Sequence, residues 1–294
     1  MILNVSGRCD IPAFFPKWFI NRYKEGFVDV KNPFNPKLVS RIYFKDVELI
    51  VFCSKNPQPI IKYLKDIDKK IEFQITITPY KTDIEPFVPS KKEVIESVKQ
   101  ISKIIGKEHV SIRYDPIFLS KKYTTKYHIK AFNYLCNELS PYIKRIIISF
   151  IDIYKNVLKN KKELDIIPFK EKDYELIGKS FSKAAHDNNI IVHTCSEKKN
   201  LVEYGFDKDE CISKMYAYSL TGKIYNEWKA RNNKNCHCAS MVDIGVYNMC
   251  MHLCKYCYAN YNERLIKFNY KNHDDNSTLL VGHIQEDDII KIRN

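Results

Sequence analysis

The sequence lacks the features that mark membrane-bound and exported proteins. It has no run of 18 apolar residues, which a membrane-spanning helix needs. Its start, MILNVSGRCD, lacks the order of basic, apolar and small residues that forms a signal peptide. We therefore expect a cytoplasmic protein with no membrane partner. Because cytosolic thiols stay reduced, the ten cysteines are expected to bind metals where they cluster rather than to pair as structural disulfides.

The sequence also lacks a sustained internal repeat and a low-complexity linker. Its apolar share of 45% is ordinary for a globular protein and allows a large core. The formal net charge is +13, and a cationic surface binds nucleic acid by releasing counterions. A solvated surface on a lysine-rich chain explains the same charge without any such partner. Nucleic acid is therefore one candidate partner and is not required by the charge.

Short β-type runs alternate with helical patterns along most of the chain. Most of these runs are near-continuous and apolar, which is typical of parallel strands buried on both faces. The expected strands are residues 1–7, 47–53, 72–78, 109–117, 145–151, 189–195 and 241–248. Helices are expected at 12–26, kinked or started at Pro16, at 90–109, where Ser90 can cap the start, and at 125–139 and 173–189. A hairpin is expected at 27–44. This alternation predicts an α/β fold with a full or partial (β/α) barrel, or alternatively a doubly wound open sheet.

We expect a single domain made of three stretches. Residues 1–195 form the barrel body, 196–240 an irregular excursion with cysteines, and 241–294 the last strand, a cysteine loop and a tail. In such folds ligands bind at the carboxyl ends of the strands, where polar residues gather in this chain. These are Ser6, Gly7, Arg8, Asp10, Lys55, Arg113, Asp115 and His193. A charge inside an apolar strand, such as Arg113, needs a partner, which favours a functional site over merely polar loops.

Three cysteines stand close together directly after the last expected strand. Cys250, Cys254 and Cys257 form a C-x3-C-x2-C pattern, so their thiolates can converge on one centre. Structural zinc sites usually take four protein ligands. Three thiolates from one loop therefore favour a four-iron cluster with one iron left open. A structural zinc clip or an inert cluster is the alternative.

Four more cysteines occupy the end of the sixth strand and the irregular excursion. They are Cys195, Cys211, Cys236 and Cys238. Together they could hold a second iron–sulfur cluster or a structural zinc, with His237 as an alternative ligand. Scattered reduced cysteines are the other explanation, since no C-x2-C pair occurs among these four.

The cysteine loop resembles that of the radical S-adenosylmethionine superfamily. Cys250-x3-Cys254-x2-Cys257 has the superfamily's spacing, and Tyr256 stands in its usual aromatic position. The string CKYCYAN is similar to the cluster loop of spore photoproduct lyase and its DNA-repair relatives. The resemblance implies a 4Fe-4S cluster, S-adenosylmethionine, and a reducing partner such as flavodoxin or ferredoxin. It also implies a 5′-deoxyadenosyl radical that abstracts hydrogen from a substrate, which the sequence does not identify.

The loop's position departs from the superfamily, whose members usually carry it after the first strand. In a closed barrel the last strand lies beside the first, so we expect a circular permutation in which residues 241–248 act as the first strand. The resemblance then implies cofactor-binding roles for Ser6, Gly7, Arg8, Asp10, Tyr256 and His193, and catalytic roles for Arg113, Asp115 and Lys55. Cys53, Cys195 and Tyr80 are candidates for a hydrogen donor or acceptor.

The whole chain also resembles an uncharacterised bacterial and archaeal domain family. The shared stretches are SGRCDIP, CSKNP, RYDP and the closing Tyr-Cys-Tyr-Ala. This second resemblance implies no substrate. The alternative function is a non-catalytic iron–sulfur or zinc protein that binds nucleic acid.

Overall fold

The computed structural model describes residues 1–226 and 236–293 and contains a seven-stranded parallel sheet. The strand order is β8-β7-β6-β5-β4-β1-β9. The strands are β1 (Ile2–Val5), β4 (Leu49–Ser54), β5 (Lys70–Thr76), β6 (Val110–Ile117), β7 (Arg145–Phe150), β8 (Ile191–Thr194) and β9 (Met241–Asp243). All seven strands expected from the sequence therefore form, and all lie parallel.

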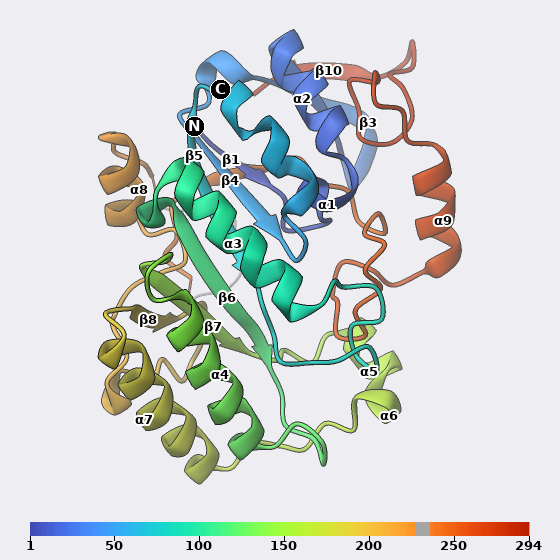
Figure 1. Cartoon of the computed structure of the whole chain (residues 1–294). Helices are drawn as coiled ribbons and strands as arrows, with labels where there is room; N and C mark the ends of the chain where they lie inside the picture. The colour runs from blue at the N-terminus through green and yellow to red at the C-terminus, as the bar shows by residue number, and fades with distance from the viewer. Residues whose placement is uncertain (227–235, 294) are drawn as a thin grey trace.

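From β1 to β8 each strand is added on the same side of the one before it. Crossovers of one hand that advance in one direction place their helices on one face of the sheet. That face carries α2 (Pro16–Glu25), α3 (Lys91–Ile105), α4 (Thr125–Leu139) and α7 (Glu171–Asp187), and Figure 1 shows α3, α4 and α7 in front of the strands. The strand order does not reverse between β1 and β8, so this sheet is not doubly wound. Within the described residues no pairing joins the edge strands β8 and β9, so the barrel is not closed.

The helix expected at 12–26 is broken at Pro16. It forms α1 (Ile11–Phe14) and α2, which ends at Gly26 with φ of 87°. Helix α3 begins with a capping box, in which Ser90 Oγ accepts from the backbone N–H of Glu93 and the Glu93 carboxylate accepts from that of Ser90. The shorter helices are α5 (Lys155–Lys159), α6 (Lys161–Leu164), η1 (Phe44–Asp46), η2 (Gln58–Asp66) and η3 (Lys107–His109).

A second, three-stranded sheet pairs a strand near the C-terminus with a hairpin from the first 45 residues. The hairpin expected at 27–44 forms from β2 (Phe27–Asn32) and β3 (Asn35–Tyr43), and β10 (Ile289–Ile292) pairs parallel to β3. Between the cysteine loop and β10 runs α9 (Glu263–Lys271). Trp18 Nε1 donates a hydrogen bond of 2.9 Å to the carbonyl of Ser277, which fastens this C-terminal stretch to α2.

The cysteine-bearing excursion packs on the sheet face opposite the crossover helices. Its described part contains η4 (Val202–Tyr204) and α8 (Lys214–Thr221). Its buried residues join one apolar cluster with strand residues Ile2, Leu49, Val51 and Ile147. The Tyr216 hydroxyl on α8 donates to the buried Glu72 carboxylate at 2.8 Å. The described part of the excursion thus covers this face at the amino ends of the strands and leaves their carboxyl ends open.

No described helix combines the length and the apolar composition that a bilayer crossing requires.

Candidate functional site

A cavity of about 1030 Å³ lies at the carboxyl ends of the parallel strands. Its volume is at the upper end of the range for small-molecule sites. Residues from all seven strand ends and from the cysteine loop line it. The residues named from the sequence that do so are Ser6, Gly7, Arg8, Asp10, Cys53, Lys55, Arg113, Asp115, Cys195, Cys211, Cys250, Cys254, Tyr256 and Cys257. One concave site therefore brings together most of the residues that the sequence pointed to.

The loop carrying Cys250, Cys254 and Cys257 follows β9, and its three thiols are half-buried and line the cavity. Two asparagines close the loop. The Asn260 side-chain amide donates to the Cys250 carbonyl at 2.5 Å, and the Asn248 side-chain oxygen accepts from the backbone N–H of Tyr261 at 2.8 Å. Burial raises the pKa of all three thiols, that of Cys254 to about 12, with nearby Lys55 acting in the opposite direction on Cys254. A cationic centre would favour their ionised form.

His252 and Asp10 anchor the loop to the sheet. His252 is buried, with Nε2 2.9 Å from an Asp10 carboxylate oxygen and Nδ1 3.1 Å from the Phe87 carbonyl. The Asp10 carboxylate also accepts from Ser54 Oγ and from the backbone N–H of Lys55, both at 2.7 Å. Asp10 thus links β1, β4 and the cysteine loop. His252, which the sequence did not single out, stands between Cys250 and Cys254 in the loop.

Tyr256 and Lys55 meet at a buried carboxylate that the sequence did not point to, Glu85. Lys55 Nζ lies 2.8 Å from Glu85, and Lys91 Nζ and the Tyr256 hydroxyl also donate to it. Burial raises the pKa of Glu85, but the two lysines more than offset that effect, and the pKa falls to about 2. Glu85 follows β5 in a polar segment, TDIEPF, with no spacing that could have revealed it.

Arg113 has the partner that its place in an apolar strand demands. Its guanidinium lies 2.5 Å from Asp115 and 3.2 Å from the Gln74 side-chain oxygen, and Ser149 donates to the other Asp115 oxygen. Burial opposes the charge of Arg113, but Asp115 holds its pKa well above the usual value. The pair is about four-fifths buried and presents both signs of charge to the cavity.

Ser6, Gly7 and Arg8 pack against Asp243 at the end of β9. The Asp243 carboxylate accepts from Ser6 Oγ at 3.0 Å and from the backbone N–H groups of Gly7 at 2.7 Å and Gly245 at 2.8 Å. Arg8 lies 4.0 Å from the same carboxylate. This acid belongs to the expected last strand, yet only the pairing of β9 with β1 gives it a role.

His193 lies outside the lining of the cavity. It is buried on β8, with Nε2 3.3 Å from an Arg145 guanidinium nitrogen. Burial and then Arg145 lower its pKa to about 4, so it is neutral at pH 7. Arg145, also missed from the sequence, pairs with Asp209 at 2.9 Å and stacks 3.7 Å from the centre of the Tyr216 ring.

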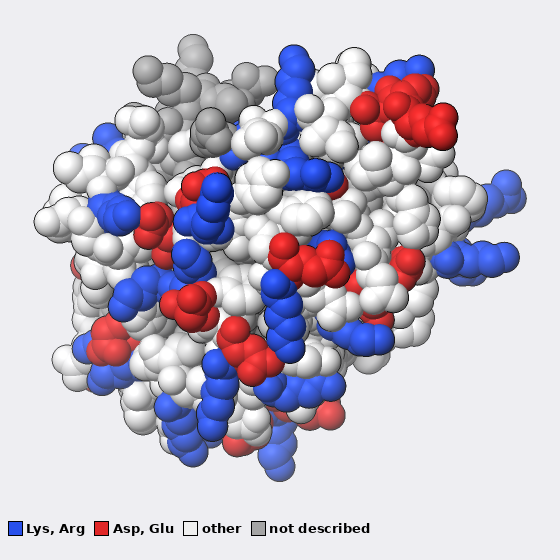
Figure 2. Space-filling view, turned by 90° about the horizontal axis from the view of Figure 1, so that it is seen from above, with Lys and Arg blue, Asp and Glu red and all other residues white. Residues whose placement is uncertain are grey.

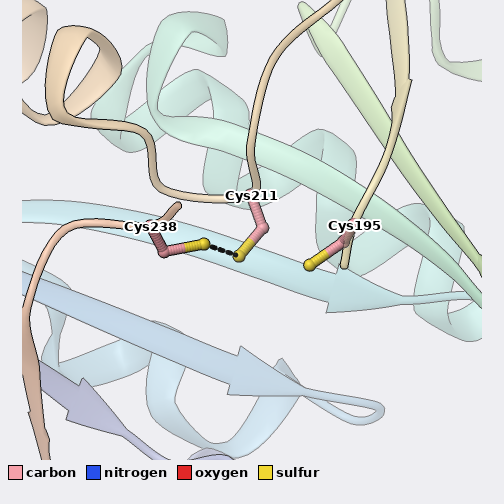
Figure 3. Close-up of side chains that lie close together, drawn as sticks. All are labelled: Cys195, Cys211 and Cys238. Carbon is pink, nitrogen blue, oxygen red and sulfur yellow. Dashed lines mark hydrogen bonds between the residues drawn. The ribbon is translucent and has the colours of Figure 1, made fainter. Parts of the chain in front are cut away.

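The second group of cysteines is brought together. The sulfur atoms of Cys195, Cys211 and Cys238 all lie within 4.8 Å of one another, and Figure 3 shows them pointing toward a common point. Cys236 is also buried and its thiol interacts with that of Cys238. His237 is exposed, so the alternative ligand points away from the group.

Comparison with known proteins gave one family. No curated protein matches the chain. A family model described as a domain of unknown function, DUF1848, matches residues 2–259, a range that includes all seven strands of the large sheet and both cysteine groups. The chain therefore belongs to the DUF1848 family.

Proposed function

We propose that the chain is an iron–sulfur enzyme of the radical S-adenosylmethionine type. The observation that carries the proposal is the placement of three half-buried thiols, Cys250, Cys254 and Cys257, on one loop facing the cavity. The neighbouring His252 is engaged at both ring nitrogens, so the loop offers three ligands. A four-iron cluster held by three thiolates keeps one iron open for a cofactor.

The spacing of the thiols supports a cluster in this loop. Among the described residues, the compact group with ligand atoms within 4.8 Å is the other one, Cys195, Cys211 and Cys238. A single ion draws its ligands that close, whereas a four-iron cluster binds each thiolate through a different iron. The wider loop trio therefore suits the larger centre.

The order of the strands supports a circular permutation. β9 pairs parallel with β1, in register from Ile2 with Met241 to Asn4 with Asp243. Read from β9, the sheet runs β9-β1-β4-β5-β6-β7-β8, so the cysteine loop follows the first strand in spatial order. That is the position in which the superfamily usually carries it.

The chain's own residues would bind and orient the reactants. When bound, the cluster and S-adenosylmethionine supply the one-electron chemistry that removes a hydrogen atom from a substrate. Arg8, Arg113 and Lys55 present cations to the cavity, suited to a carboxylate. Asp115 and Asp243 offer acceptors for an amino group or for ribose hydroxyls.

Cys53 is the best placed of the three candidates for a hydrogen donor. It lines the cavity, and burial raises its pKa to about 12, which keeps its hydrogen on sulfur. Tyr80 is buried and engaged with the Pro116 carbonyl and the backbone N–H of Phe118. Cys195 belongs to the compact thiol group. A reducing partner such as flavodoxin or ferredoxin would supply the electron.

The rim of the cavity favours a substrate with a planar ring. Phe34, Tyr154, Tyr247 and Tyr258 line it, and Phe34 at the tip of the β2–β3 hairpin is 95% exposed. Aromatic rings of this kind stack on nucleobases, and the net charge of +13 suits a nucleic acid. Figure 2 shows acidic and basic groups interspersed on one face of the molecule, so on that face the charge is not gathered into a single basic patch.

Electron paramagnetic resonance on anaerobically reconstituted, reduced protein tests the proposal. We expect a four-iron signal that shifts when S-adenosylmethionine is added, and no such signal in Cys254→Ala. Cys136→Ala, which removes a thiol buried on α4, is the matched control and should keep the signal. A cluster indifferent to the cofactor would favour the second candidate, a non-catalytic nucleic-acid-binding protein, whose affinity should fall steeply with salt.

A further inference from the structure

Four buried thiols meet on the sheet face opposite the crossover helices, apart from the cysteine loop. The Cys211 and Cys238 sulfurs are 3.1 Å apart, and the Cys238 thiol interacts with those of Cys195 and Cys236 as well. Tetrahedral zinc with bonds of about 2.3 Å to sulfur places its ligands about 3.8 Å from one another. The sulfurs of Cys195, Cys211 and Cys238, all within 4.8 Å of one another, have the dimensions of a site for one ion, and the Cys236 thiol interacts with that of Cys238.

The local sequence explains how two ligands come from so short a stretch. In an extended chain, alternate side chains point to the same side. Cys236 and Cys238 are accordingly both buried, while His237 between them is exposed. The other two ligands come from the end of β8 and from the segment before α8. Four thiols from three separate segments can enclose a centre completely.

The surroundings suit a negatively charged centre. Zinc with four thiolates carries a net charge of −2. Arg145 is buried and donates to the Cys211 carbonyl at 3.4 Å, and Gln74 donates to the same carbonyl at 3.0 Å. Arg113 is close enough to interact with the Cys195 and Cys211 thiolates. Each of these cations also pairs with a carboxylate, Arg145 with Asp209 and Arg113 with Asp115, so the two offset only part of the charge of an anionic centre.

We propose that Cys195, Cys211, Cys236 and Cys238 bind one zinc ion and that this ion fastens the 196–240 excursion to the sheet. Four protein ligands leave no open position, so the site is structural. Cys195 and Cys211 also line the cavity, so the ion forms part of the wall beside the proposed reaction site. The zinc site does not depend on the proposed enzymatic function.

Metal analysis of the full-length protein tests this site separately from the cysteine loop. The variant Cys250→Ala/Cys254→Ala/Cys257→Ala removes the ligands of the proposed cluster. We expect it to retain about one zinc per chain, with zinc-edge X-ray absorption showing four sulfurs at about 2.3 Å. Cys211→Ser/Cys238→Ser in the unaltered background should lose the zinc and keep the reconstituted iron signal.

A second measurement covers the case in which the double serine variant fails to fold. The variant Cys250→Ala/Cys254→Ala/Cys257→Ala is titrated with an organomercurial in the presence of a zinc-sensitive dye. Zinc should be released in step with the modification of about four thiols. Iron in place of zinc, a Cys211–Cys238 disulfide, or zinc removed by a mild chelator without thiol modification would each overturn the proposal. None of these outcomes bears on the cluster of the loop.

Discussion

At the scale of single residues, the Glu85 carboxylate, which Tyr256 of the cysteine loop contacts, has a strongly lowered pKa. Its folded pKa of about 2 lies below the ordinary value of 4.5, so its ionisation stabilises the fold. This contribution is present above pH 4.5 and is lost as pH falls toward 2. Glu85→Gln leaves Lys55 and Lys91 without their shared acceptor, and we expect a loss of about 3 kcal/mol at pH 7.

Urea denaturation between pH 3 and pH 7 measures this effect. The wild-type stability should fall over the acid range, and the Glu85→Gln curve should be flatter. Glu96→Gln, at an exposed position of α3, serves as the matched control and should follow the wild type. Parallel curves for Glu85→Gln and the wild type would show that Glu85 is not ionised in the way its contacts imply.

His252 holds the cysteine loop in place, and His252→Phe separates that role from packing. Phenylalanine keeps the ring that lies 4.7 Å from Phe14 but loses the bonds to Asp10 and the Phe87 carbonyl. Groups that orient metal ligands typically change metal affinity by about 10- to 100-fold. We expect iron retention after reconstitution and desalting to fall by about tenfold, with His186→Phe at an exposed site as control. Unchanged iron retention would contradict an anchoring role for His252.

At the scale of elements, local pattern predicts what local forces decide. The seven strands follow from their apolar runs. The start of α3 follows from its cap, Ser90, and the break before α2 follows from Pro16. β9 is shorter than the expected 241–248 because the Asp243 carboxylate takes the backbone N–H groups of Gly7 and Gly245. The contact with Gly7 joins residues 236 positions apart, so no local pattern contains it.

The junction of β9 with β1 leaves no room for a side chain at Gly245. A Cβ there would lie 1.8 Å from Ser6 Oγ and 2.7 Å from Ser6 Cβ. Gly245→Ala should therefore cost about 2 kcal/mol of stability through overpacking. Ser6→Gly removes both clashing atoms, so the double variant should lose about 1 kcal/mol less than the sum of the single losses. Thermal unfolding of the four proteins measures the coupling, and additive losses would show that the two residues do not clash.

At the scale of the whole molecule, the sequence predicts a site at the carboxyl ends of the strands. It does not predict which segment covers the sheet face opposite the crossover helices. The cysteines at 195, 211, 236 and 238 form one group only because the excursion folds back onto β1, β4 and β7. Arg145, Glu72 and Tyr216 tie α8 to the sheet in the same place. Such contacts depend on the path of a long irregular segment, which carries no periodic pattern to reveal its route.

Removing the proposed zinc should loosen this region and spare the rest. With the ion gone, the excursion keeps the Tyr216–Glu72 hydrogen bond and apolar contacts but loses the bonds through the ion that join Cys211, Cys236 and Cys238 to Cys195. Hydrogen exchange followed by mass spectrometry should then show faster exchange in residues 209–226 and in β8. β6, paired on both sides and covered by α3 and α4, should keep its protection. Faster exchange spread evenly over β6 and the excursion would instead mean that the ion stabilises the whole fold and not the excursion alone.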